Sequence, residues 1–62
     1  MEEVDRFESS TGSSIVLRTD GTLWEVANVT SEGEPVWTET SVSGGHPFTE
    51  EEARAEFERW RV

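Results

Sequence analysis

The chain contains no cysteine, and for a protein of only 62 residues this limits the available folds more than any other feature. Domains below about 70 residues often rely on disulfides, a bound metal or a partner chain, because their cores are small. Disulfides and thiolate metal sites are excluded here. The chain must therefore rely on a small, well-packed core, on a second copy of itself, or on a larger partner. It forms one domain, residues 1–62.

Apolar residues make up only 32% of the sequence, but three Trp and three Phe supply much of that fraction. Aromatic side chains bury the most area per residue, so a few well-placed rings can form a core. The net charge is −9, there is no Lys, and Arg supplies all five cations. Because sequence-independent nucleic-acid binding needs a basic surface, we expect no direct binding to nucleic acid.

The N-terminal stretch MEEVDRFESS is acidic and lacks the apolar region of a signal peptide. No apolar run approaches the ~20 residues that a membrane span needs. We therefore expect a soluble, cytoplasmic protein without membrane contact. Residues 9–14, SSTGSS, indicate a flexible connection, so residues 1–12 are expected to be a loosely attached segment or a short extra element.

Two β-rich runs, SIVLR and TLWEVANVT, flank the sequence TDGT and predict a β-hairpin. A two-residue type I′ turn at Asp20 and Gly21 would require positive φ at both residues. In that register Leu17 faces Trp24. One face of the hairpin then carries the apolar residues Ile15, Leu17, Trp24 and Val26.

A second turn, SEGEP, precedes the alternating run VWTETSVS, and Gly33 is its expected residue with positive φ. A two-residue loop at Glu32 and Gly33 would place Trp37 on the core face. A three-residue loop would place Val36 and Val42 there and turn Trp37 outward, because a slip of one residue exchanges the faces. We favour the second register.

Residues 49–61 have the pattern of an amphipathic helix. Thr49 is a favoured N-cap, and Glu52 three residues later completes a capping box. Glu50, Glu51 and Glu52 lie in the first turn, where the helix dipole favours negative charge. The apolar stripe consists of Ala53, Phe57 and Trp60.

These elements define an α+β fold: a three-stranded antiparallel β-meander, residues 13–43, covered on one face by the C-terminal helix, residues 49–61. A three-stranded sheet needs a cover for its apolar face, and this helix is the only candidate in the sequence.

The sequence contains no recognisable catalytic motif. His46 is the only histidine; with Glu50 and Glu51 it gives a weak metal signal, and we interpret it as an exposed loop residue. Gly44 and Gly45 are interpreted as a flexible crossover rather than an anion-binding loop. Paired carboxylates could serve acid–base chemistry, but a chain this short rarely forms a sufficient cleft. We expect no enzyme activity, no metal and no cofactor.

The leading functional hypothesis is a small, non-enzymatic module that binds a protein partner or a second copy of itself. It would use the outer face of the sheet, away from the helix, because exposed patches centred on Trp mark interfaces. The expected contact residues are Trp37 as the anchor, with Leu23, Glu25 and Glu39 around it.

Two alternatives remain open. The protein could be an acidic inhibitor or nucleic-acid mimic of the kind that phages make, which would occupy a basic groove of a host protein. The acidic surface would then include Asp20, Glu32 and Glu34 on the turns. In the other alternative, the protein is an accessory protein whose acidity serves only solubility.

Overall fold

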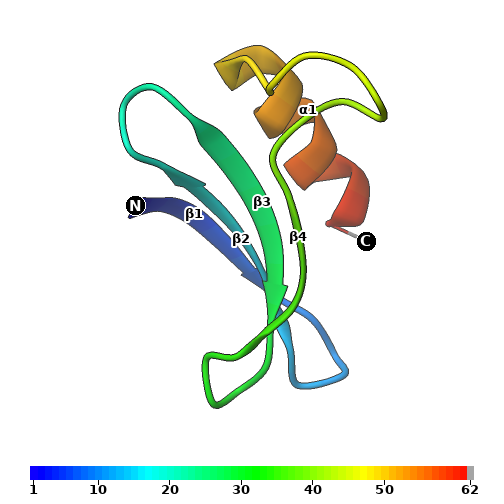
Figure 1. Cartoon of the computed structure of the whole chain (residues 1–62). Helices are drawn as coiled ribbons and strands as arrows, with labels where there is room; N and C mark the ends of the chain where they lie inside the picture. The colour runs from blue at the N-terminus through cyan, green and yellow to red at the C-terminus, as the bar shows by residue number, and fades with distance from the viewer. Residues whose placement is uncertain (62) are drawn as a thin grey trace.

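The computed structural model describes residues 1–61, which form an antiparallel sheet with one helix packed on it (Figure 1). The strands are β1 (Glu2–Glu8), β2 (Ser14–Thr19), β3 (Trp24–Val29) and β4 (Pro35–Glu39), and the helix is α1 (Glu50–Trp60). The strands follow one another across the sheet in the order β1-β2-β3-β4. The α+β class predicted from the sequence is therefore confirmed.

The prediction of three strands is wrong, because Glu2–Glu8 form a fourth strand at the edge of the sheet. β1 runs antiparallel to β2, and Phe7, which pairs with Ile15, packs partly buried against the core. An irregularity between Glu3 and Asp5 interrupts the pairing. Such a bulge breaks the two-residue alternation by which a strand is recognised in a sequence. Four carboxylates on β1 also suit an edge strand, where charge opposes pairing with other chains.

The first hairpin forms as predicted, but its turn and register differ from the prediction. Thr19 pairs with Trp24 and Leu17 with Val26, so the loop has four residues, Asp20–Leu23. Within residues 1–61 only glycines have positive φ; Gly21 has φ 96°, and Asp20 does not share the positive φ that a type I′ turn requires. The Asp20 carboxylate instead accepts hydrogen bonds from the backbone N–H groups of Thr22 and Leu23. The register differs by two residues, so the predicted faces are retained.

The second hairpin adopts the face assignment that we did not favour. Asn28 pairs with Trp37 and Val26 with Glu39. The register of the strand pairing shifts between Asn28 and Val29. Trp37 therefore lies on the helix side of the sheet and packs against the core, whereas Val36 is 60% exposed. The expected positive φ at Gly33 is confirmed at 86°. Val29 pairs with Pro35, so Val36 is the extra residue of a bulge at the start of β4. Beyond the bulge, the pairing of Asn28 with Trp37 is the one given by the two-residue loop at Glu32 and Gly33.

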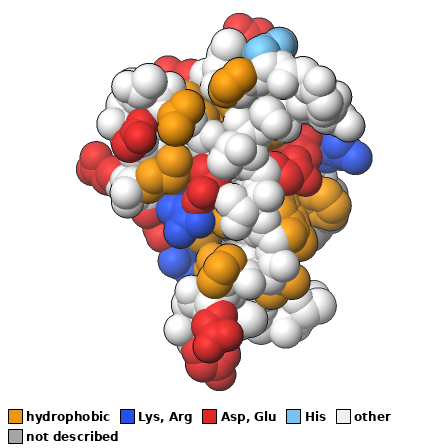
Figure 2. All heavy atoms as spheres, viewed as in Figure 1, with side chains coloured by type: hydrophobic (Ala, Val, Ile, Leu, Met, Phe, Trp, Pro, Cys, Tyr) orange, Lys and Arg blue, Asp and Glu red, His pale blue; other side chains and the backbone are white. Residues whose placement is uncertain are grey.

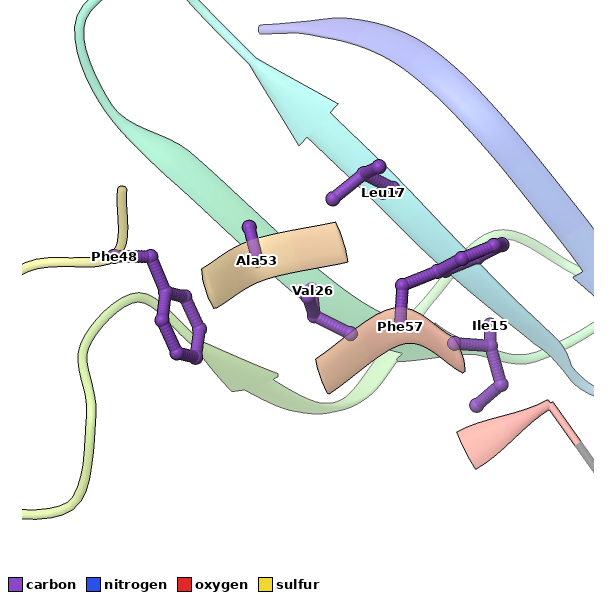
Figure 3. Close-up of a cluster of buried hydrophobic side chains, with 6 residues drawn as sticks. All are labelled: Ile15, Leu17, Val26, Phe48, Ala53 and Phe57. Carbon is purple, nitrogen blue, oxygen red and sulfur yellow. The ribbon is translucent and has the colours of Figure 1, made fainter. Parts of the chain in front are cut away.

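The helix begins as the sequence predicts. Thr49 is the N-cap, and its side chain accepts a hydrogen bond from the Glu52 N–H, while the Glu52 carboxylate accepts one from the Thr49 N–H. The apolar stripe packs on the sheet, with Ala53 0% and Phe57 2% exposed. Figure 3 shows these side chains from α1 over those of the strands. The buried core consists of Ile15, Leu17, Val26, Phe48, Ala53 and Phe57.

Residues 40–48 connect β4 to α1 through a folded turn. The Phe48 N–H donates to the Thr40 carbonyl, and the Gly45 N–H donates to the Val42 carbonyl. A Cβ atom on Gly45 would lie 2.7 Å from Cγ2 of Val42, so a side chain there would displace Val42 from its partly buried position. This connection brings Phe48 under the helix and forms one wall of the groove described below.

Candidate functional site

The four residues predicted to bind a partner do not share one face. Trp37 and Glu39 lie on the helix side of the sheet. Glu25 lies opposite Arg18 on the neighbouring strand and forms an ion pair with it, so its charge is neutralised. Leu23 is 44% exposed in the turn after β2. An outer-face site anchored by Trp37 is therefore not available in this arrangement.

The three turn residues of the predicted acidic surface are also separated. Glu32 and Glu34 are exposed in the loop after β3, at one end of the sheet, and Asp20 lies at the opposite end (Figure 1). Hydrogen bonds from the backbone of Leu23 and Thr22 hold the pKa of Asp20 below its usual value. Its carboxylate therefore serves the turn itself.

A groove between the end of β4, the connection 40–48 and α1 brings together acidic, basic, hydroxyl and aromatic side chains. Its volume is about 580 Å³. On the helix side of the space-filling view, acidic, basic and apolar side chains adjoin one another (Figure 2). The groove is lined by Glu39, Ser41, Val42, Ser43, Phe48, Glu56, Arg59 and Trp60.

Two carboxyl groups meet in this groove, one from each side. β4 directs Glu39 to the helix side, where its strand partner is the fully buried Val26. Glu56 lies on α1 next to the buried Phe57, and its side chain is 15% exposed. Both carboxyl groups line the groove, and each shifts the pKa of the other. A sheet position facing the helix normally carries an apolar residue, so both elements depart from the expected pattern at the same point.

The pKa values of the two carboxyl groups are shifted in opposite directions. Burial raises the pKa of Glu39, and the hydrogen bond and negative charge of Glu56 raise it further. Burial also acts to raise the pKa of Glu56, but hydrogen bonds from Glu39 and Trp60 and the charge of Arg59 outweigh it and lower that pKa. Glu39 therefore ionises at a higher pH than Glu56, because two adjacent like charges disfavour each other.

Aromatic rings and one guanidinium group surround this pair. Trp60 Nε1 donates to Glu56 Oε2 at 3.0 Å, and the rings of Trp60 and Trp37 lie 5.0 Å apart between centroids. Arg59 lies with its guanidinium carbon 5.7 Å from the centroid of the Trp60 ring and contacts Glu56 at 3.4 Å. The Arg59 side chain is 72% exposed. Such an exposed ion pair contributes little to stability, so Arg59 can leave this position readily.

Replacing Glu39 with glutamine is expected to stabilise the protein at neutral pH. The folded-state pKa of Glu39 is raised, so its protonated form stabilises the fold at low pH, and this contribution is lost as pH rises through the folded-state pKa. Glutamine keeps an N–H donor for Glu56 without a charge. Thermal unfolding should show Glu39→Gln melting roughly a few degrees higher at pH 7, with the difference disappearing at acidic pH.

Glu34→Gln is the control for this measurement, because it removes one charge from an exposed loop outside the groove. A difference between wild type and Glu39→Gln that does not change with pH would contradict a raised pKa of Glu39 in the folded protein.

The sequence patterns did not indicate Glu56, Arg59 or Trp60 as site residues. In the structure, Glu56 forms an ion pair with Arg59, three residues later on the helix. Trp60 was assigned to the core, but it is 38% exposed at the edge of the groove. A useful signal was available: Glu56 precedes Phe57 on the sheet-facing side of the helix, where an apolar residue is the usual choice.

His46 is 61% exposed at its side chain, and its Nε2 lies 2.9 Å from both carboxylate oxygens of Glu52. Among residues 1–61, no group of three or more His, Cys, Asp or Glu is arranged to hold a metal ion. In the same part of the chain, no helix has the length and apolar character of a membrane span.

Comparisons with models of protein families, with curated proteins and with solved structures found no match to this chain. A function for the groove must therefore be argued from its own geometry and chemistry.

Proposed function

We propose that the protein is a small, non-enzymatic binding module that recognises a basic segment of a partner protein through the groove between β4 and α1. The observation that carries the proposal is the meeting of Glu39 and Glu56 beside Trp60. The fold does not need these carboxylates, and an apolar or oppositely charged pair would stabilise it more. Places where a sequence departs from what its fold favours are often functional sites.

The charge distribution supports a basic partner. Each of the five Arg side chains forms an ion pair with a Glu of the same chain. The positive charge of the arginines is thus largely neutralised within the chain. Many carboxylates, in contrast, face solvent without a basic neighbour. Within residues 1–61, the acidic residues that form no ion pair with Arg or His are Glu2, Asp5, Glu8, Asp20, Glu32, Glu34, Glu39 and Glu51. This excess attracts basic partners over a range of about 8 Å at physiological salt.

The carboxyl pair supports binding better than it supports catalysis. Glycosidases hold their two carboxyl groups at least about 5 Å apart, because the scissile bond lies between them. Glu39 and Glu56 instead lie close enough for each to shift the pKa of the other. A cationic group can bind to such a pair, whereas a neutral substrate bond cannot enter between the two groups.

The proposal is tested with an arginine-rich peptide and its glutamine counterpart, measured by fluorescence of the tryptophans. The double variant Glu39→Gln/Glu56→Gln should bind the arginine peptide about tenfold more weakly than wild type, a change of about 1.4 kcal/mol. Glu32→Gln/Glu34→Gln removes the same amount of charge from a distant loop and should have a much smaller effect.

Equal losses for the two double variants would show that only the overall charge attracts the peptide, and the groove would then not be the binding site. Absence of binding by wild type at low salt would contradict the proposed function altogether.

Self-association through the outer face of the sheet is a second candidate. The Arg18–Glu25 ion pair on this face is neutral, and it lies beside a separate buried apolar cluster of Val16, Ala27 and Val29. Two chains of charge −9 repel each other least where such neutral surfaces meet. Light scattering over a range of concentrations should show dimers if this face is used, and a monomer at every concentration would exclude it.

A further inference from the structure

We infer that the groove binds a single arginine side chain of the partner, whose guanidinium group binds between Glu39 and Glu56 and lies against the ring of Trp60. This inference rests on the proposed function and specifies the chemical group that the site recognises.

The carboxyl pair matches a guanidinium better than an ammonium. Glu39 and Glu56 approach from opposite sides of the groove, one from the strand and one from the helix. A guanidinium group is planar and presents several N–H donors in a fixed fork, so it can bind two carboxylates together. An ammonium group is a strongly hydrated point charge without such directional pairing.

The ring of Trp60 offers the guanidinium group a second, independent contact. Trp60 lines the groove, and its indole N–H is already used by Glu56 at 3.0 Å, which fixes the orientation of the ring. Trp37 supports the ring from behind, with 5.0 Å between the two centroids. Cations placed within about 6 Å of a Trp ring are attracted by its π electrons, and arginine makes this contact more often than lysine.

Arg59 already makes the contacts that we assign to the incoming arginine, although weakly. Its guanidinium lies over the Trp60 ring at 5.7 Å and contacts Glu56 at 3.4 Å, while its side chain is 72% exposed. These distances show that a guanidinium can reach the ring and the carboxylate together. Arg59 comes from the helix beside the groove, and we expect an arginine from a partner to displace it.

Arginine binding should be coupled to the release of a proton. The charged or titratable groups at the pair are Glu39 from β4, and Glu56 and Arg59 from α1. Because the pKa of Glu39 is raised, part of the protein carries the proton at mildly acidic pH. The guanidinium binds the form in which Glu39 is ionised. Affinity should therefore increase as pH rises through the pKa of Glu39 and become constant above it.

The test uses N-acetyl-arginine methylamide, which carries only the guanidinium charge, and its neutral citrulline analogue. Binding of one side chain is expected to be weak, on the order of millimolar, because a small ligand offers few contacts. NMR shifts of the Trp60 indole N–H report it directly. The arginine compound should bind at least about tenfold more tightly than the citrulline analogue and more tightly than N-acetyl-lysine methylamide.

Three variants in the groove and two controls outside it separate this site from a general charge effect. Glu39→Gln and Glu56→Gln should each weaken binding several-fold, whereas Glu34→Gln should leave it unchanged. Arg59→Gln should strengthen binding, because it removes the internal competitor. Arg54→Gln changes the net charge equally but removes a guanidinium that pairs with Glu50 and lies over Trp24, outside the groove, so it should have little effect.

The inference is overturned if arginine and citrulline compounds bind equally, or if Arg59→Gln and Arg54→Gln have the same effect. Its failure differs from that of the proposed function. If the arginine-rich peptide binds through Glu39 and Glu56 but the single arginine compound does not, only this inference fails. If the single compound binds and the peptide does not, the site exists but does not serve recognition of a basic segment.

Discussion

Replacing Phe57 with alanine is expected to lower the free energy of unfolding by about 3–5 kcal/mol, as for other buried Phe residues. Phe57 is 2% exposed and is among the largest fully buried side chains of the chain. It connects α1 to the sheet, as Figure 3 shows. A domain of 62 residues has a total stability of roughly 3–9 kcal/mol, at roughly 0.05–0.15 kcal/mol per residue. We therefore expect the variant to be largely or completely unfolded.

Circular dichroism during urea unfolding measures this effect. Val36→Ala is the control, because Val36 is 60% exposed and its truncation should change stability by less than about 0.5 kcal/mol. If Phe57→Ala retained a cooperative transition near that of wild type, the helix would not be held on the sheet by this core.

Deleting residues 1–8 is expected to cost more than about 2 kcal/mol. The deletion removes β1, whose residue Phe7 packs against the core, and it leaves one side of β2 without hydrogen-bond partners. Burial of a Phe side chain contributes about 1.5–3 kcal/mol, reduced here because Phe7 is only partly buried, and each backbone hydrogen bond adds about 0.5–1.5 kcal/mol.

The truncated protein also has fewer negative charges, since residues 1–8 contain four acidic residues and one Arg. Reduced repulsion alone would stabilise the fold. Loss of stability in urea unfolding would therefore come from the missing strand. A truncated protein as stable as wild type would show that residues 1–8 are only loosely attached.

The elements predicted best from the sequence are those whose signals are local. The capping box at Thr49 and Glu52 depends on residues three apart, and the structure contains both of its hydrogen bonds. The faces of the first hairpin follow from the alternation of apolar and polar residues. They were predicted correctly although the predicted register differs from the observed one by two residues. The turn itself was mispredicted because the Asp20 side chain forms backbone hydrogen bonds that stabilise a wider loop.

The elements predicted poorly are those altered by bulges. One irregularity in β1 hides its alternation, and another beside Val29 determines which face of β4 meets the helix. For this reason Trp37 and Glu39 lie on the helix side of the sheet and not on the outer face, where they were predicted. The groove could not be predicted, because it requires β4 and α1 to be placed side by side before Glu39 and Glu56 can be seen to meet. Sequence patterns contain little information about that contact.

The most direct test of the proposed site is an NMR titration of the side-chain carboxyl carbons of Glu39 and Glu56. Glu39 should titrate above the ordinary glutamate value of 4.5 and Glu56 below it. Addition of N-acetyl-arginine methylamide should lower the pKa of Glu39, because the positive guanidinium stabilises the ionised carboxylate. If Glu39 titrates at the ordinary value, and the arginine compound does not change its titration, the carboxyl pair is not a site for a basic side chain.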